Sequence, residues 1–391
     1  MKRIITALIP LLLAAFLLPG CGGTTQPSGP PSLIFPTTTP SPAASSGSTK
    51  EAALQLARFP GSANMLAWSP DGTRLAVMIE KINQGVTVEV WDATTGKQLS
   101  TYSDQFADGC CLAWSPDGKQ IAVAVYPILL PSTPADPNTI RILDAATGTL
   151  LRAFDQDTNQ QFTFAHALSW VPDGAQLELL ADTQSQPGLT NATTVVVQSW
   201  DALTGKLLSA YPAPLQSQSL TYINAVAWSP DGKKMAASGT DGKVLVWDAT
   251  TGQVLLTYSG HTNTVFALVW SPDGRFLASG SADTTVQVWD ATTGKLVYRY
   301  QGHANEVHSL AWSPDSKRVV SGSSNSSNGP EEHPIQLWDA FTGQHVFAYS
   351  AESDPATALG WSPDGTRIAS ASASLTENGA IQIWTPPSES D

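Results

Sequence analysis

Two short motifs alternate along most of this chain of 391 residues. The first, Trp-Ser-Pro-Asp-Gly, begins at Trp68, Trp114, Trp228, Trp270 and Trp361, with variants at Trp170 and Trp312. The second, Trp-Asp-Ala-x-Thr-Gly, begins at Trp91, Trp200, Trp247, Trp289 and Trp338, with a variant at Leu143 and a truncated copy at Trp384. Successive copies of the first motif are 46, 56, 58, 42, 42 and 49 residues apart. Such a period indicates one fold built from repeated units.

Each unit is predicted to form four short antiparallel strands. Ser-Pro-Asp-Gly has Pro and Gly at the positions where a tight turn needs them, and Asp-Ala-Thr-Thr-Gly is a second turn. The segments beside the turns alternate and are β-branched, as in Val286-Gln287-Val288-Trp289. Four strands in a period of at least 42 residues are typical of a propeller blade. The sequence therefore predicts an all-β, seven-bladed β-propeller.

The two motifs resemble those of the WD-repeat family over about residues 53–384. Repeat five is the closest match, and the resemblance implies a hydrogen-bond relay there through His261, Ser279, Asp283 and Trp289. Repeat six keeps its counterparts His303, Ser321 and Trp338, but an insertion displaces the Asp position. The other repeats keep less of the pattern. We expect the relay to be structural, with those blades held mainly by packing.

The two ends of the repeat region predict how the ring closes. The seventh repeat stops at Trp384, and Thr385-Pro386-Pro387 cannot continue into a paired strand. Residues 54–59 alternate like a fourth strand and precede the first motif. We therefore expect this N-terminal strand to complete the last blade, with residues 52–386 as the propeller and 387–391 as a tail.

The N-terminal segment is typical of a secretory signal. Lys2 and Arg3 precede an apolar run from Ile4 to Leu18, and Leu18-Pro19-Gly20-Cys21 resembles the bacterial lipobox. The resemblance implies a signal peptide over residues 1–20, a lipidated Cys21 and a bacterial cell-envelope protein anchored on the extracytoplasmic side. Residues 21–51, rich in Pro, Ser and Thr, are predicted to be a disordered tether. An uncleaved anchor and ordinary secretion are the alternatives.

The composition and the motifs of the chain argue against several functions. The net charge of -13 argues against nucleic-acid binding, and no catalytic or phosphate-binding motif is present, so we expect no enzyme activity and no cofactor. Asp155, Asp157 and Asn159 have the spacing that begins a calcium loop, but a solvated acidic loop is the better interpretation. The resemblance to the WD-repeat family implies that the adjacent Cys110 and Cys111 lie on opposite faces of a first strand, as packed thiols or a labile disulfide.

One face of the propeller is predicted to carry the function. Calling the strands of a blade a to d, the b–c connections share a face. From the glycine of the first motif (Ser316 in repeat six) to the start of the second motif, repeats one to seven take 19, 25, 26, 15, 15, 22 and 19 residues. The b–c connections therefore differ in length from repeat to repeat. Function often resides in such loops, although surface loops also vary without one.

The apolar loop tip at Tyr126, Ile128, Leu129 and Leu130 is a candidate partner-binding segment, or it covers its own blade. We expect a non-enzymatic scaffold that binds a protein or cell-envelope partner. The alternative is a small-ligand-binding or enzymatic propeller that uses its central channel. The two motifs account for all thirteen tryptophans, so none is expected to be a separate ligand platform.

Overall fold

The computed structural model describes residues 55–60, 63, 65–81, 85–104, 107–127, 138–155, 162–184, 193–214, 223–324, 334–349, 356–372 and 380–387. The chain divides into two units, Met1–Ser48 and Thr49–Asp391, and every described residue lies in the second. All regular elements of the described residues are strands.

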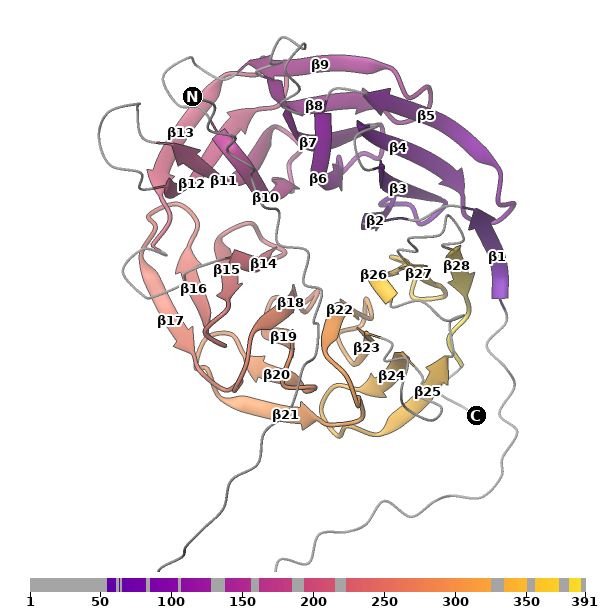
Figure 1. Cartoon of the computed structure of the whole chain (residues 1–391), viewed down its shortest axis with the longest axis vertical. Coiled ribbons are helices and arrows are strands. Elements are labelled where there is room, and N and C mark those ends of the chain that lie inside the picture. Colours follow the sequence, from indigo (N-terminus) through magenta and orange to yellow (C-terminus); the bar gives the residue numbers. More distant parts are fainter. Residues whose placement is uncertain are drawn as a thin grey trace, which may run out of the picture. The chain divides into compact units, whose positions relative to one another are not determined.

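The strands form seven four-stranded antiparallel sheets, arranged as the blades of a ring (Figure 1). This confirms the predicted seven-bladed β-propeller. The innermost strands, a, are β2 (Met65–Trp68), β6 (Ala107–Trp114), β10 (Phe162–Trp170), β14 (Ile223–Trp228), β18 (Val265–Trp270), β22 (Val307–Trp312) and β26 (Ala356–Trp361). The second strands, b, are β3 (Arg74–Lys81), β7 (Gln120–Pro127), β11 (Gln176–Gln184), β15 (Lys234–Gly239), β19 (Phe276–Ser281), β23 (Arg318–Ser323) and β27 (Ile368–Ser372).

The outer half of each blade follows the same order. The third strands, c, are β4 (Gly85–Asp92), β8 (Asn138–Asp144), β12 (Thr193–Asp201), β16 (Val244–Asp248), β20 (Val286–Asp290), β24 (Ile335–Asp339) and β28 (Ala380–Trp384). The outermost strands, d, are β5 (Gln98–Asp104), β9 (Leu150–Asp155), β13 (Leu207–Pro212), β17 (Val254–Tyr258), β21 (Leu296–Tyr300), β25 (His345–Tyr349) and, in blade 7, β1 (Gln55–Pro60).

The strand β1 closes the ring, as predicted. It pairs antiparallel with β28, and Ala57 lies opposite Ile383 while Phe59 lies opposite Ile381. The strand covers Gln55–Pro60, one residue later than the sequence suggested. Because β1 comes from the start of the propeller and β28 from its end, this pairing joins the two ends of the ring.

The hydrophobic core is divided among the seams between neighbouring blades. In β11, Leu177 and Leu179 belong to the apolar cluster shared with blade 2, whereas Leu180 belongs to the cluster shared with blade 4. Successive side chains of a strand point to opposite faces, so each strand serves two seams. A residue change in one strand therefore acts on one particular seam.

The two repeated turns are fixed by their own side chains. In blade 5 the Ser271 hydroxyl donates to Asp273 and accepts from the backbone N–H of Phe276. In the c–d turn, Asp290 accepts from the backbone N–H groups of Thr292 and Thr293. Equivalent bonds recur around the ring, so one face of the propeller consists of locally closed turns.

Candidate functional site

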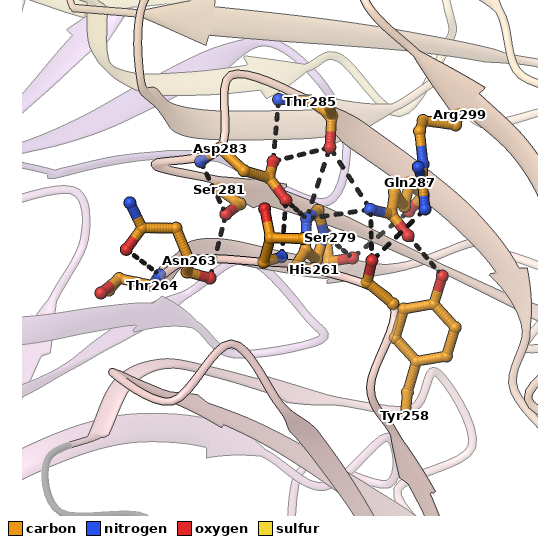
Figure 2. A network of polar contacts seen from close by, with 12 residues as sticks. Tyr258, His261, Asn263, Thr264, Ser279, Ser281, Asp283, Thr285, Gln287 and Arg299 are labelled. Atoms are coloured by element: carbon orange, nitrogen blue, oxygen red, sulfur yellow. Dashed lines mark hydrogen bonds and ion pairs between the residues drawn. The ribbon is translucent and has the colours of Figure 1, made fainter. Parts of the chain in front are cut away.

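A buried polar network crosses blade 5 (Figure 2). The His261 Nδ1 atom lies 2.8 Å from Asp283 Oδ2, and its Nε2 lies 2.8 Å from the Ser279 hydroxyl. The Trp289 indole N–H donates to the same hydroxyl over 3.2 Å. Because the carboxylate can only accept, Nδ1 carries the proton, and the bonds then run from Trp289 through Ser279 to His261 and on to Asp283.

The electrostatics of this network favour a charged aspartate. Burial by itself would raise the pKa of the Asp283 carboxyl, but the hydrogen bonds from His261 and Thr285 outweigh it and hold that pKa well below the usual range. The side chains of His261 and Asp283 are almost fully buried, at 0% and 9% exposure. A network closed this tightly has no open position for a substrate, so its chemistry suits a structural role.

Blade 6 contains part of the same arrangement. The His303 Nε2 atom lies 2.7 Å from the Ser321 hydroxyl, which also accepts from the Trp338 indole at 3.0 Å. The Nδ1 atom of His303 has no hydrogen-bond partner among the described residues. Burial, with a smaller effect from His345, lowers the pKa of His303 to about 4, so this histidine is neutral near pH 7.

A second set of polar contacts, which the sequence motifs did not indicate, links neighbouring blades. A tyrosine that ends strand d donates to a glutamine in strand c of the next blade, with O···O distances of 2.5 to 2.6 Å: Tyr258 to Gln287, Tyr300 to Gln336 and Tyr349 to Gln382. In blade 2, Arg141 replaces the glutamine and pairs with Asp104 and the Tyr102 hydroxyl. In the sequence, this contact is marked by a Tyr shortly before one copy of the first motif and a Gln two residues before the Trp of the next second motif.

The innermost strands carry a recurring irregularity. The a–b pairing shifts register by one residue in blades 2 to 7, which is a β-bulge. The residues at these bulges are Cys110, His166, Asn224, Phe266, His308 and Thr357, and blade 3 has a second register shift at Thr163. Phe266 and His308 stack at 4.6 Å, and Glu306 contacts His308. This mixed set lies on the strands that surround the channel, where the alternative ligand-binding hypothesis would place its site.

The bulge in blade 2 changes the prediction for the two cysteines. The resemblance to the WD-repeat family implied that Cys110 and Cys111 lie on opposite faces of the first strand. The register shifts between Gly109 and Cys111, and the two sulfur atoms lie 2.8 Å apart. No disulfide bond joins the two thiols. The bulge is the physical reason for the difference, since it interrupts the alternation of side chains.

Several predicted residues lie outside the described part of the chain. These include Cys21, Ile128, Leu129, Leu130, Asp157 and Asn159, and for Tyr126 and Asp155 only the backbone is described. Within the described residues no cluster of three or more His, Cys, Asp or Glu side chains could hold a metal ion. Across the same described part of the chain, no helix has the length and apolar character needed to cross a membrane.

The two faces of the ring differ in how the chain is connected. All seven a–b turns and all the c–d turns lie within the described residues. The connections over residues 82–84, 128–137, 185–192, 325–333 and 373–379 join strands b and c. The longer connections therefore attach to the end of the blades opposite the closed turns.

Comparison with known proteins supports the repeat assignment. A family model of the IFT122 first beta-propeller matches residues 222–384. The WD repeat-containing protein VIP3 of Arabidopsis thaliana is 28% identical over 139 residues, which cover 34% of this chain and 42% of that protein. These matches support the WD-repeat β-propeller family.

Two further matches are shorter. The small ribosomal subunit protein RACK1y of Oryza sativa subsp. japonica is 40% identical over 67 residues, which are 16% of this chain and 20% of that protein. The Periodic tryptophan protein 2 homolog of Dictyostelium discoideum is 43% identical over 54 residues, which are 14% of this chain and 6% of that protein. The chain thus spans less than half the length of the relatives it matches.

Proposed function

We propose that this chain is a non-enzymatic scaffold that binds a protein or cell-envelope partner through its b–c connections. The observation that carries the proposal is the contrast between the two faces. Side-chain hydrogen bonds close the a–b and c–d turns, and their lengths hardly vary. The variable lengths fall at the b–c face, where a rigid scaffold can present different loops without disturbing its blades.

The described polar network also favours binding over catalysis. A catalytic base needs an accessible position next to a substrate. The histidine of blade 5 is instead held on both ring nitrogens by Asp283 and Ser279. One relative is by its name a small ribosomal subunit protein and therefore part of an assembly. A role in assembly is consistent with a propeller whose polar groups serve its own fold.

We further propose that the propeller is tethered outside the cytoplasmic membrane of a bacterium through Cys21. The support is the lipobox-like Leu18-Pro19-Gly20-Cys21 after an apolar run, followed by a Pro/Ser/Thr-rich stretch. A protein with two acyl chains stays on a membrane, whereas one chain gives marginal binding. Replacing Cys21 with Ser should move the protein from the membrane fraction to the soluble fraction, and an unchanged distribution would contradict lipidation.

Affinity capture from intact cells tests the scaffold. In one variant, residues 128–137 and 185–192 are each replaced by the short b–c connection of blade 5. This variant should keep its melting temperature and lose its partner. Recovery of the same partner with wild-type yield would contradict the proposal. A matched control extends the c–d turn of blade 5 by Gly-Ser insertion after Thr293, and this variant should keep both partner and fold.

A further inference from the structure

A cavity of about 170 Å³ lies at the seam between blades 3 and 4. Its lining includes Glu178 of β11, Trp228 at the end of β14, and the turn residues Pro172, Ser229 and Gly232. A single water molecule needs a cavity volume of only about 10–15 Å³. The cavity therefore has room for a group of several heavy atoms.

The corresponding place at two other seams is filled by an arginine of this chain. Arg74 donates from Nη2 to the Gly118 carbonyl over 2.7 Å, and its guanidinium lies 4.8 Å from the centre of the Trp114 ring. Arg367 makes the same pair of contacts, 2.7 Å to the Gly72 carbonyl and 5.2 Å to Trp68. Such a planar cation is well suited to an indole face and a carbonyl together.

A third arginine shows part of the same geometry, and blade 3 lacks it. Arg318 of blade 6 lies 5.2 Å over the Trp361 ring. The repeat places Gln176 where blade 1 has Arg74, and Gln176 accepts a hydrogen bond from Ser199. Trp228 and Gly232 occupy the positions of Trp114 and Gly118. The ring and the turn that hold a guanidinium elsewhere are thus present without an internal guanidinium.

The seam itself is more open here than at the other blades. In five of the seven copies of the first motif, the indole N–H of the opening tryptophan donates to a carbonyl of the preceding blade. These are Trp68, Trp114, Trp170, Trp270 and Trp312. The Trp228 Nε1 atom makes no hydrogen bond within the described residues. The other six tryptophans that open a first motif are each at most 9% exposed, whereas Trp228 is only half-buried.

A carboxyl group faces this opening. Glu178 stands where the other second strands have a small apolar residue: Ala76, Ala122, Ala236, Ala278, Val320 and Ala369. Burial raises the pKa of Glu178 to about 7, against a smaller lowering by the Ser199 hydroxyl. A raised pKa is expected for a buried carboxyl without a cation beside it. A bound cation would favour the ionised form of Glu178.

We propose that this cavity binds a guanidinium group, presented by an arginine of a protein partner. The Trp228 ring supplies the stacking face, the Gly232 turn supplies a carbonyl, and the Glu178 carboxylate supplies the counter-charge. Two of these three features are those that hold Arg74 within the chain, and the carboxylate is added only here. The cavity lies at the a–b turns, on the face opposite the b–c connections, so this site is independent of the proposed scaffold face.

Binding is tested with small arginine probes on the full-length protein in detergent. With ¹⁵N-labelled tryptophan, the Trp228 indole signal is identified by its loss in Trp228→Phe. N-acetyl-arginine methylamide should shift this signal in a saturable way, and the neutral citrulline analogue should bind at least about tenfold more weakly. Equal binding of the two probes, or no shift of Trp228, would overturn the proposal.

Three variants separate the site from nonspecific binding. Glu178→Gln should weaken the arginine probe about tenfold. Gln176→Arg should fill the cavity from within and abolish binding, whereas Gln120→Arg, at the equivalent position one blade earlier, should leave it unchanged. Undiminished binding by Gln176→Arg would contradict the proposal. These outcomes do not depend on the b–c connections, so failure of the scaffold proposal would be seen separately.

Free arginine distinguishes the two sources of this ligand chemistry. Its α-ammonium and α-carboxylate remain at the cavity mouth, where a polypeptide would continue the chain. Weaker binding than the blocked form supports an arginine within a partner protein. Equal or tighter binding supports a guanidinium site but overturns its assignment to a partner protein.

Discussion

At the residue scale, the same motif position has different consequences in different blades. Ser279 serves two partners, because it accepts from the Trp289 indole and donates to His261. In blade 4 the equivalent residue is Ala237, so Trp247 lacks that hydroxyl acceptor. A buried polar group that loses its partner costs more than the bond contributes when formed. For the stability of a blade, it therefore matters more that every member of a relay is paired than that a relay is present.

Replacing Ser279 with Ala should destabilise the propeller by about 2–4 kcal/mol, because it leaves a buried indole N–H and a buried imidazole nitrogen unpaired. Urea unfolding followed by tryptophan fluorescence measures the change. The surface substitution Thr292→Ala is the control and should be close to neutral. A loss for Ser279→Ala that equals that of Thr292→Ala would contradict the structural role of the relay.

The Glu178→Gln substitution should make stability depend less on pH. The pKa of Glu178 is raised from 4.5 to about 7, so in wild type its contribution is fully present below pH 4.5 and is lost as pH rises through 7. The facing Tyr211 hydroxyl, whose pKa burial raises to about 12, stays neutral across this range, and the Asp248 carboxylate stays charged.

The variant should therefore be more stable than wild type at pH 8, by roughly 2–3 kcal/mol, with the difference vanishing below pH 4.5. Chemical denaturation at several pH values measures this. A constant difference at all pH values would contradict the raised pKa. Ala122→Glu, at the equivalent and fully buried position of blade 2, should destabilise the protein at pH 8 instead.

At the scale of single elements, the sequence predicted the turns and strands well. The Pro and Gly of each turn, and the alternation before each Trp, depend only on local backbone preferences. The bulge that brings Cys110 and Cys111 together and the Tyr258–Gln287 contact were missed. Both depend on the neighbouring strand or blade, which a single repeat does not contain.

One turn departs from this local agreement. Thr284 adopts a φ of 67°, which a β-branched residue rarely does, while Gly242 holds the equivalent position in blade 4 with a φ of 77°. Replacing Thr284 with Gly should stabilise the protein by about 1 kcal/mol by relieving this strain. The reciprocal Gly242→Thr should destabilise it, because a Cβ there would lie 2.9 Å from the Asn263 carbonyl oxygen.

Thermal unfolding by circular dichroism measures both turn variants. The expected pattern is a higher melting temperature for Thr284→Gly and a lower one for Gly242→Thr. Equal small decreases would show that the left-handed conformation carries little strain at either position.

At the scale of the whole molecule, the repeats could be counted from sequence, and the missing last strand indicated how the ring closes. The cavity between blades 3 and 4 could not be predicted in the same way. Its signals, Gln176 and Glu178, are visible as departures from the repeat, but their meaning depends on how two blades meet.

Removing residues 55–60 should cost at least about 3 kcal/mol, because it leaves β28 as an unpaired edge and exposes apolar surface of the last blade. Removing residues 22–50 instead should leave the melting temperature unchanged. If both deletions were equally harmless, closure by β1 would contribute nothing to stability.

Photo-crosslinking in cells shows whether the partner binds the b–c face. A photoreactive residue at position 129 should cross-link the partner. The same residue at Phe341, an exposed position in the c–d turn of blade 6 and away from the cavity between blades 3 and 4, should not. Cross-links from position 341 and none from position 129 would place the partner on the other face and contradict binding at the b–c connections.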